Sequence, residues 1–343
     1  MAALLNTAIY GFKNHTRMAF GPLRHVGNSS SSSLVQSNHL KIKSKISPSS
    51  GFAFEEYKTL KIERINKALD EAVPLKHPTI LHEAMKYTLL AGGERLFSTL
   101  CIASCELVGG NESLVMPMAC ALETMTTAEI VADDLPCMDD DDIRCGMPTN
   151  HKVFGVGTSV IACHALIYQA IEHVLTKTKD VEPNRLIQAI NEICKAMGAA
   201  GVSAGQCADM HSEGKEVSLR ELEFIHQHKI EKILQASMVC GTILGGGTEV
   251  EIERLNKYGK NVGLAFQVWD DILDVTGSPE TLGRNLGGDA LRGKATHPKL
   301  IGLDESVKFA KQLVADAIQE LAYFDSARAD PLYHIANSIA GFV

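Results

Sequence analysis

Six aspartates lie within a ten-residue stretch that begins at Asp133, directly after the apolar run "CALETMTTAEIVA". The run is typical of a buried helix, so Asp133 and Asp134 end a core element, where unpaired charge is costly. Pro136 disturbs the following turn, and the third carboxylate therefore comes from Asp139 and not from the i+4 residue, Cys137. So dense a cluster repels itself unless cations lie among its side chains.

A second acidic cluster, "DDILD", ends another apolar helix. Apolar residues recur every three to four positions across "IERLNKYGKNVGLAFQVWDDILD", which predicts a long buried helix. Asp270 and Asp274 share one face of it, Asp271 lies between them, and Gln267 lies one turn earlier. A lone cluster of this kind would be a solvated helix end. Two clusters on core helices, about 130 residues apart, instead predict facing walls of one cavity.

The ligands in both clusters are carboxylate oxygens, which favour magnesium over zinc or copper. Calcium storage is the competing interpretation, but neither cluster has an EF-hand loop with its central glycine. Magnesium among carboxylates can hold a diphosphate leaving group, and Arg144, Lys229 and Lys294 are the cations expected to complete its neutralisation. The apolar helices would supply the dry surroundings that an allylic cation needs.

Helical patterning continues almost throughout the chain from Phe52, with no convincing alternating strand pattern. The stretch "ILHEAMKYTLL" predicts a helix that stops at Gly92 and Gly93. Cys101 and Cys105 in "CIASC" are expected to be core residues, because no second cysteine pair lies nearby to complete a metal site. We expect residues 51–343 to form one all-α domain, a large helical bundle around a central cavity.

The first fifty residues contain no acidic residue, six Lys or Arg and ten Ser, a composition typical of a cleaved organelle transit peptide. The abundance of serine favours the chloroplast, with the mitochondrion as the alternative and a disordered tail as the simpler interpretation. Beyond this segment, 27 basic residues face 41 acidic ones, a net charge of −14, which argues against a nucleic-acid partner. We expect no membrane span, since no run of eighteen apolar residues occurs.

Together these motifs resemble a known family. The two aspartate clusters, "CIASCELVGG", "GMPTNHKVFG", "AGQCAD", "FQVWDDILDV" and "HPKLIGLD" are similar to segments of plant geranylgeranyl diphosphate synthases, members of the trans-prenyl diphosphate synthase family. The resemblance runs from Phe52 to the C-terminus. It implies an isoprenoid synthase fold, a magnesium-dependent transferase, and a homodimer or a heterodimer with another synthase subunit. It also implies condensation of isopentenyl diphosphate with allylic diphosphates to geranylgeranyl diphosphate.

The resemblance also implies roles for individual residues. The allylic half of the site matches the family pattern. Its metal ligands are Asp133, Asp134, Asp139, Asp270, Asp271 and Asp274. The residues expected to bind substrate are Arg95, Arg144, Lys229, Gln267, Arg284 and Lys294. Asp133, Asp134, Asp270 and Lys229 are the residues expected to carry catalysis.

The isopentenyl half departs from the family pattern. The family's "GGKRVRP" is "GGERLFS" here, which places Glu94 and Phe97 where a lysine and an arginine are usual. Thr126 replaces a histidine, and Cys145 replaces an arginine. The charge at the three cationic positions changes from +3 to −1. Losing three charge-assisted hydrogen bonds would weaken diphosphate binding by at least about 4 kcal/mol. Arg95 is retained.

Two hypotheses follow for function. The first is a plastid geranylgeranyl diphosphate synthase with weak activity, since Ala128 allows a product of twenty carbons or more, although Glu129 is an unexpected carboxylate in the hydrocarbon tunnel. The second is a non-catalytic or regulatory subunit of a heterodimeric synthase. A class I terpene cyclase is a third interpretation, and it is disfavoured because the second motif repeats DDxxD.

Overall fold

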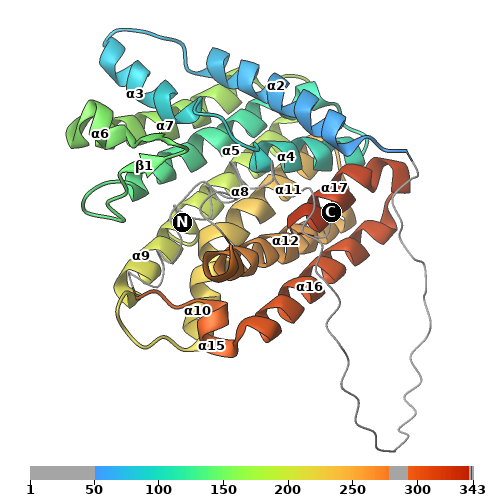
Figure 1. Cartoon of the computed structure of the whole chain (residues 1–343). Helices are drawn as coiled ribbons and strands as arrows, with labels where there is room; N and C mark the ends of the chain where they lie inside the picture. The colour runs from blue at the N-terminus through green and yellow to red at the C-terminus, as the bar shows by residue number, and fades with distance from the viewer. Residues whose placement is uncertain (1–50, 278–292, 340, 342–343) are drawn as a thin grey trace, which may run out of the picture.

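Almost all of the regular structure is helical. The computed structural model describes residues 51–277, 293–339 and 341 (Figure 1). The helices of the first half are α2 (Phe54–Ala72), α3 (Thr79–Leu89), α4 (Leu96–Leu107), α5 (Glu112–Asp133), α6 (Asn150–Phe154), α7 (Val156–Lys177) and α8 (Pro183–Met197). Those of the second half are α9 (Val202–Ser212), α10 (Leu219–His226), α11 (Lys232–Leu244), α12 (Glu249–Thr276), α15 (His297–Ile301), α16 (Leu303–Glu320) and α17 (Ser326–Ile339).

Four short elements complete the described chain. A π-helical turn, η1 (Gln227–Glu231), joins α10 to α11, and a 3-10 turn, η2 (Leu321–Tyr323), follows α16. The strands β1 (Ile143–Arg144) and β2 (Met147–Pro148) form a small antiparallel hairpin. The expected all-α class is confirmed. The predicted transit segment, residues 1–50, and the predicted substrate residue Arg284 lie outside the described residues.

Helix boundaries follow from local sequence. Helix α3 ends at Leu89, and the chain then passes through Gly92 and Gly93, whose φ values of 105° and 125° are ones that side chains disfavour. Helix α12 begins with a capping box in which Thr248 and Glu251 each bond the other's backbone N–H. The predicted glycine stop and the predicted long helix are both confirmed.

The core is built around α12, which packs between α11 and α16 (Figure 1). Helix α11 also packs on α4 and α5, so it separates the helices that carry the two aspartate motifs. Gly241 makes this packing possible, because a Cβ atom there would lie 2.0 Å from the backbone oxygen of Cys101. Cys101 and Cys105 are buried free thiols, as expected.

Helix α5 is long and apolar enough to cross a membrane by length and composition alone. In the fold it is a core helix, since 83% of its apolar window is buried inside the protein. This burial matters for the candidate site, because the helix runs through the core and ends there at Asp133.

Candidate active site

The first aspartate motif lies where α5 ends. Asp133 is the last residue of the helix, and Asp134 follows it as the C-cap, with both side chains buried. The loop then turns back, so that the Asp139 backbone N–H donates to the Asp133 carbonyl at 2.9 Å. This turn places the Asp139 carboxylate in the interior, 3.6 Å from the Lys294 ammonium. Cys137 points to solvent.

Asp134 forms a buried ion pair with Arg144 on β1. The Arg144 guanidinium donates to both Asp134 oxygens and, at 3.1 Å, to Asp141. Burial raises the pKa of Asp134 to about 6, against the opposing effect of Arg144. The pair fixes the hairpin against the end of α5.

Asp133 has a different environment. Both of its carboxylate oxygens are buried, and neither accepts a hydrogen bond from the residues that the structure describes. Burial and the nearby charge of Asp139 raise the pKa of Asp133, although Lys229 acts in the opposite direction. Buried carboxylate oxygens without donors are costly unless a cation binds them. The donor set therefore fits a hard divalent ion such as magnesium.

Two lysines share one carboxylate next to this motif. Asp209 on α9 accepts from Lys229 at 2.5 Å and from Lys294 at 3.0 Å. Burial alone would raise the pKa of Asp209, but the two ammonium groups hold it well below its usual range. Burial would lower the pKa of Lys229, but Asp209 and Asp133 raise it. The Asp209 carboxylate therefore stays deprotonated, and the Lys229 ammonium stays protonated, in the protein interior. Asp209 belongs to the "AGQCAD" segment, but the sequence pattern assigned it no role.

The second motif lies near the end of α12, and all three of its aspartates are buried. Asp271 accepts a hydrogen bond from the Gln267 amide at 3.1 Å and another from the His297 backbone N–H at 2.8 Å. Asp270 and Asp274, one turn apart, lie on the same helix face, as expected from their spacing.

A short segment connects the two motifs. Lys294 faces Asp139 of the first motif, and three residues later His297 bonds Asp271 of the second. The π-helical turn η1 supplies Lys229 to the same region, since it packs on both α9 and α12. π-helical turns recur at functional sites. The structure therefore brings the two motifs and two lysines together.

Most of the positions expected to hold isopentenyl diphosphate, though not Glu94, lie around one small cavity, together with Arg144. Its lining includes Arg95, Phe97, Thr126, Arg144 and Cys145. The cavity measures about 20 Å³, which is room for roughly one water molecule. A diphosphate cannot enter it without movement of the surrounding side chains.

Comparison with known proteins identifies the family. A model of the polyprenyl synthetase family matches residues 78–329. The chain belongs to this family. It is 50% identical to heterodimeric geranylgeranyl pyrophosphate synthase large subunit 1, chloroplastic, of Arabidopsis thaliana, over 91% of this chain and 86% of that protein. It is 49% identical to the chloroplastic geranylgeranyl pyrophosphate synthase of Capsicum annuum, over 84% of this chain and 79% of that protein.

Solved structures agree with this assignment. Geranylgeranyl pyrophosphate synthetase from Pyrococcus horikoshii superposes with a TM-score of 0.77 at 28% identity, over 84% of this chain and 99% of that chain. An apo farnesyl/geranylfarnesyl diphosphate synthase from Zymomonas mobilis gives 0.76 at 30% identity, over 84% and 98%. The expected isoprenoid synthase fold and prenyltransferase class are confirmed.

The comparison with the family motif gave one wrong expectation, which concerns the negative charge of Glu94. Glu94 forms an ion pair with Lys58 at 3.2 Å and lines a separate cavity beside α2 and α17. The expectation that Glu94 makes the isopentenyl pocket negative was therefore wrong. The acidic residue in the lining is Glu123, whose carboxylate lies 3.5 Å from the Arg95 guanidinium.

Arg95 is held in place by its neighbours. Besides Glu123, its guanidinium donates to the Asn66 side chain and to the Leu89 carbonyl, each at 2.8 Å. Its backbone adopts a left-handed conformation at the start of α4, with φ at 49°. These contacts make Arg95 part of the scaffold of the pocket.

Glu129, one turn before Asp133, is partly buried. Burial and the charge of Asp133 raise its pKa to about 7. A large share of the protein therefore carries a neutral Glu129 at neutral pH, which eases the conflict between a carboxylate and a hydrocarbon tunnel. Ala128 beside it is buried and small, as the sequence indicates.

Proposed function

We propose that this prenyltransferase uses magnesium to condense isopentenyl diphosphate with allylic diphosphates, forming geranylgeranyl diphosphate. The observation that supports the proposal best is the buried Asp133 carboxylate, which has no hydrogen-bond donor among the described residues and lies near the charged Lys229. An apolar site would not retain such groups, whereas a metal-bound diphosphate requires both.

The residues of the site would have separate roles in this reaction. The carboxylates of the two motifs would bind the magnesium ions, which neutralise the leaving diphosphate when bound. Lys229 and Lys294 would donate hydrogen bonds to diphosphate oxygens, because Asp209 already holds both ammonium groups on that side of the site. Arg144 would add positive charge, positioned by Asp134. The buried helices α5, α11 and α12 would keep water from the allylic cation.

The relatives support a chloroplast location and a partner subunit. The Arabidopsis protein reported above is named as a large subunit of a heterodimeric enzyme and as chloroplastic. We propose that this chain likewise acts in the chloroplast, that residues 1–50 direct it there, and that it pairs with itself or with another synthase subunit.

The proposed reaction is tested with purified protein, magnesium, farnesyl diphosphate and labelled isopentenyl diphosphate. A twenty-carbon diphosphate product is expected, at a slow rate. Failure to form any longer prenyl product, alone or after mixing with a candidate partner synthase, would contradict the proposed activity.

A second experiment tests why the reaction should be slow. Phe97→Arg together with Cys145→Arg adds two cations to the lining of the small cavity. Charge-assisted hydrogen bonds contribute roughly 1.5–3 kcal/mol each, so we expect isopentenyl diphosphate consumption at low concentration to rise by at least about tenfold. Glu94→Lys is the matched control. It reverses a charge outside this cavity and should give no such gain.

The size of the cavity also supports a second candidate function, a regulatory subunit. In that case the chain would change the rate or product of a catalytic partner while its own isopentenyl site stays closed. Asp133→Asn with Asp270→Asn separates the two functions. The double variant should abolish the proposed reaction, whereas a regulatory effect on the partner would survive it.

A further inference from the structure

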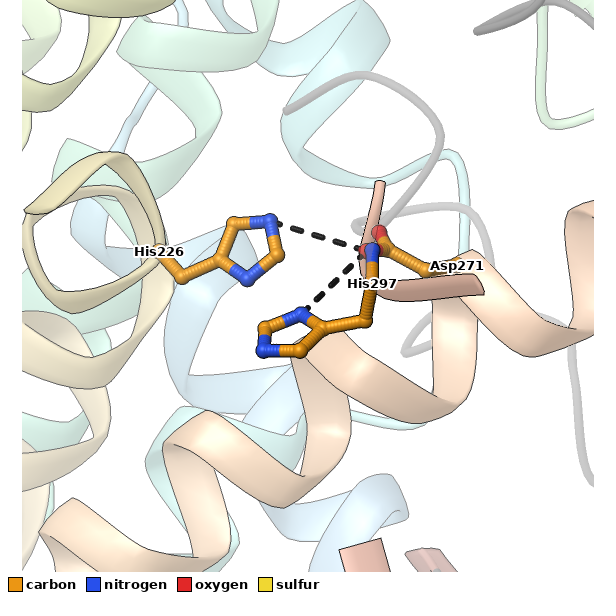
Figure 2. A group of neighbouring side chains, drawn as sticks. All are labelled: His226, Asp271 and His297. Carbon is orange, nitrogen blue, oxygen red and sulfur yellow. Dashed lines mark hydrogen bonds and ion pairs between the residues drawn. The ribbon is translucent and has the colours of Figure 1, made fainter. Parts of the chain in front are cut away.

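Three buried side chains meet beside the second aspartate motif (Figure 2). They are His226 at the end of α10, Asp271 in α12 and His297 at the start of α15. One ligand atom from each lies within 4.8 Å of the other two. None of the three residues exposes more than 3% of its surface.

The two histidine nitrogens converge on a single carboxylate oxygen. His226 Nε2 lies 3.7 Å from Asp271 Oδ2, and His297 Nδ1 lies 3.6 Å from the same atom. Both distances exceed that of a hydrogen bond. His297 Nδ1 is also buried and has no hydrogen-bond partner within the described part of the chain. A polar atom in this situation is costly unless a ligand satisfies it.

Aromatic packing explains only part of the arrangement. The two imidazole rings lie 4.9 Å apart at a tilt of 33°, and His297 stacks on Phe309. These contacts account for the burial of the rings. The His297 backbone N–H also donates to Asp271 Oδ2 at 2.8 Å, which fixes the start of α15 beside the carboxylate. Neither kind of contact accounts for two ring nitrogens that approach the same oxygen at ion-pair distance, 3.7 and 3.6 Å, beyond hydrogen-bond reach.

We propose that His226 Nε2, Asp271 Oδ2 and His297 Nδ1 bind one divalent transition-metal ion of the zinc class. Imidazole nitrogens favour such ions, whereas magnesium prefers oxygen ligands. Ligands about 2.0–2.1 Å from a tetrahedral ion lie roughly 3.4 Å from one another. The two nitrogen–oxygen distances, 3.7 and 3.6 Å, are within a few tenths of an ångström of this value. The three atoms together span up to 4.8 Å, so a bound ion would draw the two imidazole rings together by up to about 1.4 Å. Three protein ligands leave one position for water.

This site adjoins the proposed magnesium site and shares Asp271 with it. Asp271 lies about 100° around the helix from Asp270 and about 60° from Asp274, so it borders the face that Asp270 and Asp274 share. Its Oδ2 faces the two histidines. A bound ion would join α10, α12 and α15. Those helices flank Lys229 and Lys294, so the ion would fix the elements that position both lysines.

The test uses the full chain, stripped of metal with a chelator and without any substrate, in a large excess of magnesium. Zinc titrated into it should bind at one ion per chain. Zinc X-ray absorption should show nitrogen and oxygen ligands with imidazole scattering and no sulfur. Because no substrate is present, this outcome does not depend on the proposed reaction.

Variants locate the ion. His226→Phe and His297→Phe should each weaken zinc binding by at least about tenfold, the loss that removing even an outer partner of a metal site can cause. The matched control is Cys207→Ser with His211→Ala, which removes the exposed pair whose sulfur and nitrogen lie 3.7 Å apart. That control should leave the affinity unchanged.

The opposite pattern overturns the proposal. Zinc binding that survives both phenylalanine variants and disappears in the control would assign the ion to the exposed pair. A zinc absorption spectrum that shows only oxygen ligands would assign the ion to the aspartate motifs. The spectrum is recorded on the unaltered protein, so the test remains decisive even where a variant fails to fold.

Discussion

Asp209→Asn tests the electrostatics of the site most directly. In the folded protein one Asp209 oxygen contacts the Lys229 ammonium at 2.5 Å and the Lys294 ammonium at 3.0 Å. The two nitrogens therefore lie at most about 5.5 Å apart. At an effective dielectric constant of about 20, two like charges at that distance repel by about 3 kcal/mol once the shared carboxylate is gone.

This estimate agrees with the cost of breaking a buried ion pair, about 3–5 kcal/mol. For a chain of this size we expect the Tm to fall by roughly 6–10 °C at pH 7. Asp70→Asn is the matched control, because it makes the same chemical change in an ion pair with Lys86 on the surface. Surface pairs contribute only about 0–1 kcal/mol, so its Tm should hardly change.

Thermal unfolding followed by circular dichroism measures both variants. The pKa of Asp209 is depressed in the folded state, so its contribution is present above its unfolded pKa of about 4 and is lost as the pH falls further. The difference between the variant and the unaltered protein should therefore shrink in strong acid. Magnesium pyrophosphate should also raise the Tm of Asp209→Asn more than that of the unaltered protein, since the anion replaces the missing charge.

A Tm for Asp209→Asn within about 2 °C of the unaltered protein at pH 7 would refute this reasoning. It would mean that the two lysines do not both depend on Asp209. An equal pyrophosphate effect on the two proteins would show instead that the lysines do not face the diphosphate.

Three further predictions concern the fold. Burial raises the pKa of Glu129 from 4.5 to about 7, so the folded protein loses stability as the pH rises through that window. Glu129→Gln should therefore be more stable than the unaltered protein at pH 8 by on the order of 3 kcal/mol, but not at pH 4, in thermal melts without divalent ions. Tyr258→Phe removes a buried hydrogen bond of 2.6 Å to a backbone carbonyl of α17, and it should lower the free energy of unfolding by about 1 kcal/mol. An unchanged urea midpoint would contradict this prediction. Gly241→Ala places a methyl group against the Cys101 backbone and should lower the free energy of unfolding by at least about 2 kcal/mol. Gly157→Ala, where a Cβ atom would meet nothing within 4 Å, should stabilise α7 by about 0.5–1 kcal/mol. If urea unfolding gave stability changes of the same sign for both variants, the packing argument would be contradicted.

The helices were predictable because a helix that buries one side has apolar residues every three to four positions in its sequence. The apolar residues from Ile252 to Ile272 are buried or, like Ile252 and Trp269, pack partly buried against the core, and the glycines after α3 mark its end. The π-helical turn η1 was not predictable, because "FIHQHKIEKIL" has the composition of a continuous helix. Whether a turn widens there depends on how α9 and α12 pack against it, which no local pattern records.

The site was predictable where a role depends only on residue type and helical spacing. Asp270 and Asp274 are of this kind, since a spacing of four fixes their common face. Asp209 is different. It is one acidic residue on a helix with no clear pattern, and its importance arises because Lys229 and Lys294, from distant segments, reach the same oxygen.

Glu94 and Glu123 show the same limit at the isopentenyl pocket. Alignment with the family motif identifies the residue at each position but not the direction of its side chain. Arg95, which follows Glu94, adopts a left-handed backbone, and Glu94 reaches Lys58 on α2 instead of the cavity. Glu123 lies in the middle of α5, and its carboxylate meets Arg95 at the cavity. The pocket thus keeps two basic residues, and each is paired with a carboxylate, Arg95 with Glu123 and Arg144 with Asp134. Any gain of isopentenyl diphosphate binding must therefore come from new cations at Phe97 and Cys145, and not from reversing Glu94.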